Sequence, residues 1–456
     1  MRPGRQGRPG FLAPLVFLLA CASAPPPAET TTAASSAPAA LAAPPTVAGT
    51  PPGERAPTPL EMGALRRLMG EAQRTRRLSF TAPVHVEVHD AERIAARLDG
   101  QIEDEDVEKA ELVYGTLGLL PEGLDLRGLL REVLGEQVLG YYDTDEARLV
   151  VREDVMEVLA RRATSAEAAE ARIVIVHELV HALQDQALRL GEAWEIERDS
   201  DADNALRALV EGDATLAMMV YAAEKLGVPL EALAGDAAVE TLMAQSVGAG
   251  DDALGRAPPI LRHTLVTPYV AGLRFARELR RAGDWRGVDG AFERKPASTE
   301  QVLHPRRYLQ GEEPDPIALP AFPALEEAGL EPVEEDTLGE LEVAVFLGRG
   351  TESGVDAAAA DGWGGDRLRV YRWADGRSEL GVAVWFMTFD DEAEAREAEA
   401  AARRTLGADE LRREGRALLV TLRLPEALRP PVDAAFAGFE EDLPPTPPRR
   451  PSTIAP

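Results

Sequence analysis

Cysteine is nearly absent from this chain, which has one among 456 residues. A single cysteine excludes intrachain disulfides and zinc or iron–sulfur sites built from cysteine. Basic residues are also scarce, since 49 Lys and Arg face 78 Asp and Glu and leave a net charge of −29. This balance argues against a nucleic-acid-binding protein and against attachment to anionic lipid by charge alone, because both need a basic face. No run reaches the roughly 18 apolar residues of a membrane-spanning helix.

The first 20 residues are typical of a secretory signal peptide. Three arginines precede residue 10, and an apolar h-region of about ten residues follows at 11–20. The sequence Leu18-Leu19-Ala20-Cys21 then resembles a bacterial lipobox, in which the cysteine is acylated and becomes the mature amino terminus. We therefore predict residues 1–20 as signal peptide and Cys21 as the site of a lipid anchor. The alternative is an ordinary signal peptide with a chance cysteine.

Residues 21–58 predict a disordered tether. Ala, Pro, Ser, Thr and Gly make up most of this segment, which has too little apolar surface to fold by itself. A tether of this kind would hold a soluble body away from the lipid surface. The expected location is the periplasmic or cell-surface side of a membrane, and alanine rather than aspartate after Cys21 favours the outer membrane where the cell has one.

The pattern that follows predicts an α+β protein. Residues 59–315 are expected to form a mainly helical domain with a small amino-terminal sheet, made from a strand at 83–89 and a hairpin at 140–151. The main helices expected in this domain lie at 60–78, 91–119, 124–134, 165–190 and 204–226, with further helices up to about residue 290.

A second, smaller α+β domain is expected at residues 335–440. Prolines between residues 314 and 332 mark the boundary, and a proline-rich tail at 441–456 is predicted to be disordered. The strands expected in this domain lie at 341–346, 367–373, 380–386 and 417–424, and the helices at 391–404 and 431–439.

The sequence His177-Glu178-Leu179-Val180-His181 is an H-E-x-x-H motif inside an apolar stretch that predicts a buried helix. Histidines four positions apart share one helix face, with Cβ atoms about 5–6 Å apart. His177 and His181 are therefore predicted to offer two imidazoles to one Zn²⁺ ion. Glu178 lies about 100° further around the helix, where its carboxylate can act as a base on zinc-bound water. The alternative is two structural histidines and a surface glutamate.

A catalytic zinc ion needs a third protein ligand and one open position. The H-x-x-G-x-x-H extension of the metzincins is excluded, because Gln184 and Ala187 occupy the positions of its glycine and histidine. A glutamate on a later helix is the other solution, and Glu211 in the segment ALVEGDA is the predicted ligand. Asp201 and Asp203 are the alternatives, because they lie closer to the motif along the chain.

The helix pair that carries HELVHALQDQ and ALVEGDA resembles gluzincin-type zinc metallopeptidases, and more closely an uncharacterised group of bacterial lipoproteins. The resemblance extends to GYYD at 140–143, to PASTEQVLHP at 296–305 and to GWGGD at 362–366. It covers most of residues 60–440, although only the H-E-x-x-H part is specific to a chemistry. The resemblance implies a metallopeptidase fold and a hydrolytic zinc, and it implies no particular substrate.

Other residues are expected to support the site. Zinc-bound histidines usually donate their second nitrogen to an oxygen acceptor, and Asp185 and Asp213 are candidates for that role. The oxyanion that develops on an attacked carbonyl needs a hydrogen-bond donor. Tyr269 resembles a tyrosine that gluzincin aminopeptidases carry after the third ligand, and His263 and His304 are the other candidates.

Two further segments have structural interpretations. His85, Glu87 and His89 share one face of the first strand, because alternate residues of a strand point the same way. They are interpreted as the polar face of an edge strand; a second metal site or contact with substrate is the alternative. The segment 362–366 is interpreted as a turn, with metal binding by Asp366 as the alternative.

These observations together predict a lipid-anchored, extracytoplasmic zinc metallopeptidase that acts on a peptide or protein substrate. One alternative is a non-catalytic envelope lipoprotein in which a structural or vestigial zinc site belongs to a partner-binding protein. Another is a zinc hydrolase of a different amide or ester bond. Three protein ligands plus water favour an enzyme, whereas a fourth protein ligand favours a structural site.

Overall fold

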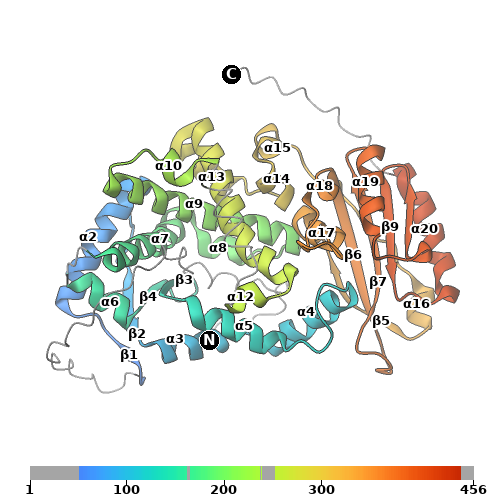
Figure 1. The fold of residues 1–456 in the computed structure, drawn as a ribbon, viewed down its shortest axis with the longest axis horizontal. Helices are drawn as coiled ribbons and strands as arrows, with labels where there is room; N and C mark the ends of the chain where they lie inside the picture. The colour runs from blue at the N-terminus through green and yellow to red at the C-terminus, as the bar shows by residue number, and fades with distance from the viewer. Residues whose placement is uncertain (1–50, 162–164, 237, 239–251, 443–456) are drawn as a thin grey trace.

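The computed structural model describes residues 51–161, 165–236, 238 and 252–442. The fold is α+β, as predicted, with a four-stranded sheet towards one end, a five-stranded sheet towards the other, and long helices between them (Figure 1). The predicted signal peptide, Cys21 and all but the first two residues of the predicted tail lie outside the described residues. In the described part of the chain, no helix combines the length and the apolar character needed to cross a bilayer.

The amino-terminal sheet contains β1 (Glu54–Arg55), β2 (His85–His89), β3 (Gly140–Asp143) and β4 (Arg148–Arg152), in the order β1-β2-β4-β3. β2 runs parallel to β4, and the predicted hairpin of β3 and β4 is antiparallel. β1 pairs with β2, although it lies inside the segment predicted as a tether. The folded chain therefore begins before residue 58, earlier than the composition suggested.

The interpretation of β2 as an edge strand is wrong, because β1 and β4 flank it on both sides. His89 is fully buried, whereas the side chain of His85 is 66% exposed. Between them, both carboxylate oxygens of Glu87 accept hydrogen bonds from Arg148, at 2.8 and 2.7 Å. This face of the strand is thus occupied by an internal ion-pair network.

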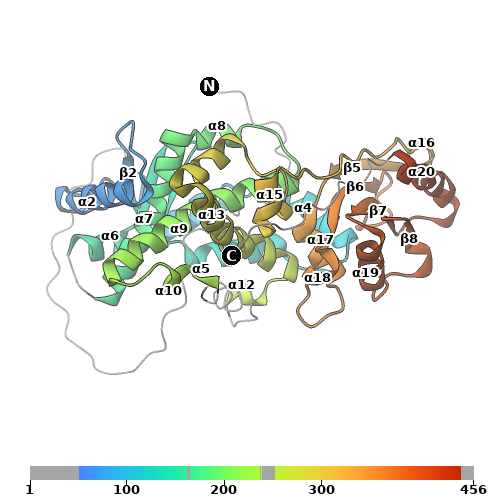
Figure 2. The same cartoon turned by 90° about the horizontal axis from the view of Figure 1, so that it is seen from above.

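Helices make up the rest of the amino-terminal part. In the middle of this part, α9 packs against both α7 and α13 (Figure 2). The single helix predicted at 91–119 is two helices, because residues 100–103 leave the helical path. The helices are α2 (Pro59–Arg76), α3 (Ala91–Asp99), α4 (Asp104–Thr116), α5 (Leu126–Gln137), α6 (Glu153–Ala160), α7 (Ala166–Leu188), α8 (Leu190–Trp194), α9 (Ser200–Leu226), α10 (Glu231–Ala234), α12 (Ala253–Arg256), α13 (Pro259–Glu293), α14 (Thr299–Leu303) and α15 (Pro305–Gln310).

The carboxyl-terminal sheet is antiparallel, with the strand order β5-β6-β7-β9-β8. The elements of this part are α16 (Pro323–Glu327), β5 (Leu330–Asp336), α17 (Gly339–Leu347), α18 (Ala357–Ala360), β6 (Trp363–Trp373), β7 (Val382–Phe389), α19 (Glu392–Ala402), β8 (Leu411–Glu414), β9 (Ala417–Leu422) and α20 (Arg429–Asp442). Alternate residues of β7 point to opposite faces of the sheet. Trp385 therefore packs with α17, α18 and α19, while Phe386 packs with α16 and α20.

The strand predicted at 341–346 is a helix, α17, and all of its residues are buried. A short apolar run bounded by turns suits a buried strand and a buried helix equally, so its pattern could not decide between them. The Asp366 carboxylate accepts the backbone N–H groups of Leu338 and Gly339 at the start of α17, at 3.0 and 2.9 Å. The interpretation of 362–366 as a turn is also wrong, because β6 begins at Trp363.

Buried polar contacts attach the start of α9 to β5 of the carboxyl-terminal part and to α14. The backbone N–H of Ser200 donates to Asp336 at 2.8 Å, and the hydroxyl of Ser200 donates to the same carboxylate. Asp201 accepts hydrogen bonds from the backbone N–H and the hydroxyl of Thr299, at 2.8 and 2.6 Å. These contacts hold the amino-terminal end of the helix that carries Glu211.

Candidate metal centre

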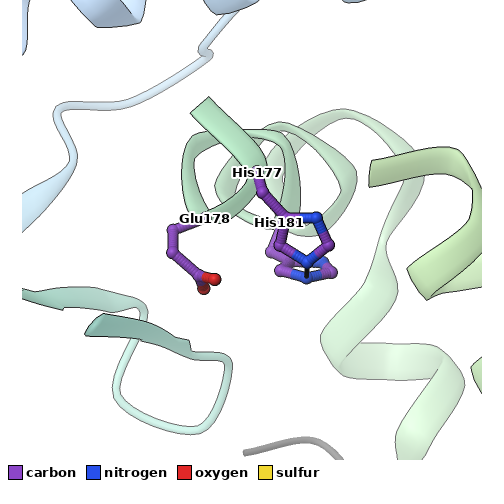
Figure 3. Close-up of side chains that lie close together, drawn as sticks. All are labelled: His177, Glu178 and His181. Atoms are coloured by element: carbon purple, nitrogen blue, oxygen red, sulfur yellow. Dashed lines mark hydrogen bonds between the residues drawn. The ribbon is translucent and has the colours of Figure 1, made fainter. Parts of the chain in front are cut away.

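Helix α7 carries the H-E-x-x-H motif through the interior. The Ser165 hydroxyl caps its first turn by accepting a hydrogen bond from the backbone N–H of Ala168. Residues 174–184 are buried, so packing on all sides keeps this largely apolar segment helical. The Nε2 atoms of His177 and His181 lie 3.0 Å apart on one side of the helix (Figure 3).

Helix α9 brings Glu211 to these two imidazoles. Its Oε2 atom lies 3.2 Å from Nε2 of His177 and 3.5 Å from Nε2 of His181. All three side chains are almost fully buried, at 0 to 3% exposure. The structure therefore places the predicted third ligand together with the two histidines, although thirty residues separate Glu211 from His181.

The spacing of the three atoms fits a zinc ion. Ligand atoms at about 2.0–2.1 Å from a tetrahedral zinc lie about 3.3–3.4 Å from one another. The observed separations of 3.0, 3.2 and 3.5 Å bracket this value. Neither carboxylate oxygen of Glu211 has a hydrogen-bond partner of good geometry within the described residues. A buried anion in that position calls for a cation.

The electrostatics of the three groups agree with this interpretation. Burial disfavours a charged imidazole, but the carboxylate of Glu211 raises the pKa of His181 to about 9. Burial likewise disfavours a charged carboxylate, but the two imidazoles lower the pKa of Glu211 to about 2. Glu211 is therefore an anion that stabilises positive charge at the point where the two imidazoles meet.

Glu178 lies beside the three proposed ligands. It is 1% exposed, and its carboxylate offers an oxygen within 4.8 Å of ligand atoms of both His177 and His181. It projects from the same side of α7 as the imidazoles (Figure 3). Its Oε2 atom accepts the backbone N–H of Tyr142 in β3, at 3.0 Å. This bond holds the carboxylate close to the site without making it a ligand.

A chain of buried hydrogen bonds orients His181. The Oε1 atom of Gln184 lies 2.8 Å from Nδ1 of His181, and its Nε2 atom donates to Val210 and Asp213, each at 2.9 Å. Because the amide group must donate to these two oxygens, its carbonyl faces the imidazole, and Nδ1 carries the proton. In the neutral imidazole the lone pair is then on Nε2, the nitrogen that faces His177 and Glu211.

Asp213 is linked to His181 through Gln184, whereas the prediction had it accept directly from an imidazole. Asp213 also accepts a hydrogen bond from Nε of Arg76, at 2.6 Å, with both side chains buried. Sequence reasoning missed Gln184 and Arg76 as parts of the site. Gln184 follows His181 by three positions, on the same face of α7, which is a signal that could have identified it.

The Gln184→Met variant tests this arrangement, because methionine has a similar shape and cannot accept the proton of Nδ1. We expect about 10- to 100-fold weaker zinc binding, as for other groups that orient metal-bound histidines. Gln310→Met, at an exposed position in α15, is the matched control and should bind zinc like the wild-type chain. Competition with a chromophoric chelator measures both affinities. Equal affinity in the two variants would contradict the assigned role of Gln184.

Asp185 has a different role from the one predicted. It accepts hydrogen bonds from the hydroxyl of Tyr142, at 2.8 Å, and from the backbone N–H of Gly191, at 3.0 Å. Neither imidazole is among its partners within the described residues. Asp185 therefore anchors β3, the strand whose Tyr142 N–H holds Glu178.

The alternative ligands lie too far from the imidazoles. Asp201 and Asp203 occupy the first turn of α9, and ten residues separate Asp201 from Glu211. At 1.5 Å per residue, that separation is about 15 Å along the helix. Asp201 is bound to Thr299, and Asp203 lies 3.8 Å from Arg198. The geometry favours Glu211.

Of the three candidates for oxyanion donor, Tyr269 is the one beside the site. Its ring lies 6.5 Å from that of His177, centre to centre, with 29° between the planes. Burial and Arg262 lower the pKa of His263 to about 4, and no interaction joins His263 to His177, His181 or Glu211 in the described part of the chain. His304 is hydrogen-bonded to Glu340 of α17 instead.

Two glycines allow α9 and α13 to come close enough to build this site. A Cβ atom at Gly212 would overlap the backbone of Gly272, and one at Gly272 would overlap the carbonyl oxygen of Ala208. Gly212 directly follows Glu211, and Gly272 lies one turn after Tyr269. The close crossing therefore sets the distance between the third ligand and the tyrosine.

The Gly212→Ala variant should destabilise the protein by about 3 kcal/mol, because the added methyl meets rigid backbone and not a side chain that could move. Gly290→Ala, on α13, is the control: apart from its own helix backbone and chain neighbours, no atom lies within 4 Å of the position that its added methyl would take. It should be neutral or stabilising by about 0.5–1 kcal/mol. Urea unfolding of both variants measures the difference, and equal stabilities would show that the helices can move apart.

Comparison with known proteins informs the carboxyl-terminal part alone. A family model described as a domain of unknown function (DUF8575) matches residues 328–437, from just before β5 into α20. A search among curated proteins and a search among solved structures each found no match. The matched residues do not include α7 or α9, so the interpretation of the metal centre depends on its geometry.

Proposed function

We propose that this chain is a zinc-dependent peptidase of the gluzincin type, exported and anchored to a membrane by lipid on Cys21. The observation that supports the proposal best is the convergence of His177, His181 and Glu211 at zinc-like spacing, with Glu178 beside them. Glu178 is the remaining carboxylate beside these three residues, and it accepts the backbone N–H of Tyr142. Within the described residues, no fourth protein ligand completes the group. An open position of that kind is typical of catalytic zinc.

In the proposed mechanism, the two histidines and Glu211 would hold zinc, which when bound would act as a Lewis acid towards a water molecule and the scissile carbonyl. Glu178 takes a proton from the attacking water and later delivers it to the leaving amine. Its hydrogen bond from Tyr142 fixes the carboxylate for this transfer. The hydroxyl of Tyr269 is the proposed donor to the developing oxyanion.

An extended peptide is the substrate that the surroundings favour. β3 is the outer strand of its sheet, and Tyr142 uses its outward N–H group to hold Glu178. In an antiparallel strand, the N–H and C=O of one residue point to the same side, so the Tyr142 carbonyl faces the same outer edge of the sheet. A peptide that pairs with this edge would bring its backbone next to the proposed base.

A peptide library digested with the zinc-loaded full chain tests the proposal. We expect cleavage that stops when zinc is chelated and returns when zinc is restored. Mass spectrometry of the products identifies the bonds cut and separates internal cleavage from removal of terminal residues. Chelator-insensitive cleavage would overturn the proposal, and hydrolysis of ester or non-peptide amide substrates alone would replace it by the related hydrolase class.

A further inference from the structure

A second group of metal-binding side chains lies where α14 and α15 meet the carboxyl-terminal part. His304 stands between α14 and α15, Glu340 lies in the first turn of α17, and Asp361 directly follows α18. The Nε2 atom of His304 lies 2.9 Å from Oε1 of Glu340 and 3.2 Å from Oδ1 of Asp361. We name these three residues the junction cluster.

Glu340 is incompletely satisfied in this position. The residue is 3% exposed, and its second carboxylate oxygen, Oε2, has no hydrogen-bond partner within the described residues. A buried carboxylate oxygen without a donor is costly, because it loses its hydration without compensation. The oxygen belongs to the same carboxylate that faces His304, so a cation bound to the cluster would satisfy it.

The surroundings contain several acidic side chains around a single guanidinium group. Glu300, Glu312 and Asp390 form a neighbouring group, and each contacts Arg307, at 2.6, 2.9 and 2.9 Å respectively. That guanidinium is therefore already shared by three carboxylates. Burial raises the pKa of Glu300 to about 9, and the charge of Glu340 adds to the rise, so the two groups influence each other.

We propose that His304, Glu340 and Asp361 bind a second divalent metal ion of the zinc class, separate from the one at His177. One imidazole and two carboxylates form a donor set that zinc accepts, and their ligand atoms all lie within 4.8 Å of one another, with His304 at 2.9 and 3.2 Å from the two carboxylates. The ion would have access from solvent, because the side chains of His304 and Asp361 are 31% and 65% exposed. It would join the corner between α14 and α15 to α17 and α18.

The competing explanation is an ion pair, in which a protonated His304 serves Glu340 and Asp361 without any metal. Metal stoichiometry separates the two. The full chain carrying His177→Ala and His181→Ala lacks the first centre and is the background for the measurement. Equilibrium dialysis against Zn²⁺, followed by elemental analysis, should give about one equivalent of bound zinc in this background. Absence of bound zinc would overturn the proposal whatever the outcome at the first centre.

Variants in this background locate the ion. His304→Ala and Glu340→Gln should each weaken zinc binding at least tenfold. His85→Ala removes another exposed histidine that contacts a glutamate, and it should leave the stoichiometry unchanged. Asp361→Asn should also weaken zinc binding about tenfold. Because the Asp361 side chain is exposed, this change does not disturb the core. The Asp361 variant therefore keeps the test decisive if Glu340→Gln fails to fold. Undiminished binding in both His304→Ala and Asp361→Asn refutes the assignment.

Cobalt provides a spectroscopic check on the same variants. Co²⁺ added to the His177→Ala, His181→Ala chain should give visible absorption bands from a site with nitrogen and oxygen ligands. These bands should vanish in His304→Ala and persist in His85→Ala. Bands that persist in His304→Ala would place the ion elsewhere and contradict the proposal.

Discussion

Replacement of Glu178 by glutamine should leave zinc bound and lower peptide cleavage by about 10²- to 10⁴-fold. Glutamine keeps the size of the side chain and can still accept the backbone N–H of Tyr142, so the local structure should persist. It cannot take a proton from the attacking water at neutral pH. The loss should therefore appear in kcat, with little change in KM.

Glu170→Gln is the matched control, since Glu170 is an exposed glutamate on the same helix. Metal content, circular dichroism and peptide cleavage are to be measured for both variants. The Glu170 variant should resemble the wild-type chain in all three. A Glu178→Gln chain that binds zinc and cleaves peptides at the wild-type rate would rule out the proposed base, whereas loss of zinc would make Glu178 a ligand.

Replacement of Glu211 by alanine should weaken zinc binding at least about a hundredfold, because it removes one of three protein ligands and the negative charge that compensates the metal. Glu211→Gln keeps the volume of the side chain and should also bind poorly, since a neutral amide is a weaker ligand. Zinc content after dialysis against a weak chelator measures the loss. Both Glu211 variants are measured in a chain that also carries His304→Ala, so that zinc bound at the junction cluster does not contribute to the measured content.

Asp201→Asn and Asp203→Asn are the controls that separate the candidate ligands. Burial raises the pKa of Asp201 well above its usual range, and asparagine keeps the size of the side chain and an oxygen that can accept the hydrogen bonds of Thr299. Both variants should retain the zinc that Glu211→Ala loses. The opposite result, with zinc lost from an aspartate variant and kept in Glu211→Ala, would transfer the third ligand to the start of α9.

The helices of the candidate site could be predicted because their signals are local. Four-residue spacing places His177 and His181 on one face of any α-helix, whatever surrounds it. Glu211 could be named as the third ligand from its place in an apolar helical segment. The role of Gln184 could not be predicted in the same way. Its amide is oriented towards His181 by hydrogen bonds to Val210 and Asp213, which lie on another helix.

The errors concern segments whose state depends on distant contacts. The residues of α17 are apolar on every side, and their helical state follows from full burial and from Asp366, which lies beyond the end of the helix in sequence. β1 has no strand pattern of its own and exists because Glu54 and Arg55 pair with β2. β2 became an interior strand for the same reason.

Periodicity and side-chain chemistry act within a few residues, so the α+β composition, the buried H-E-x-x-H helix and the donor types that suit zinc all follow from the order of the amino acids. Which carboxylate meets the two imidazoles, and how closely, follows instead from packing in three dimensions. That choice depends on the crossing of α9 and α13 at Gly212 and Gly272, and on the attachment of α9 to the carboxyl-terminal sheet through Ser200. Contacts between residues far apart in the chain leave no periodic signal, so packing alone could establish them.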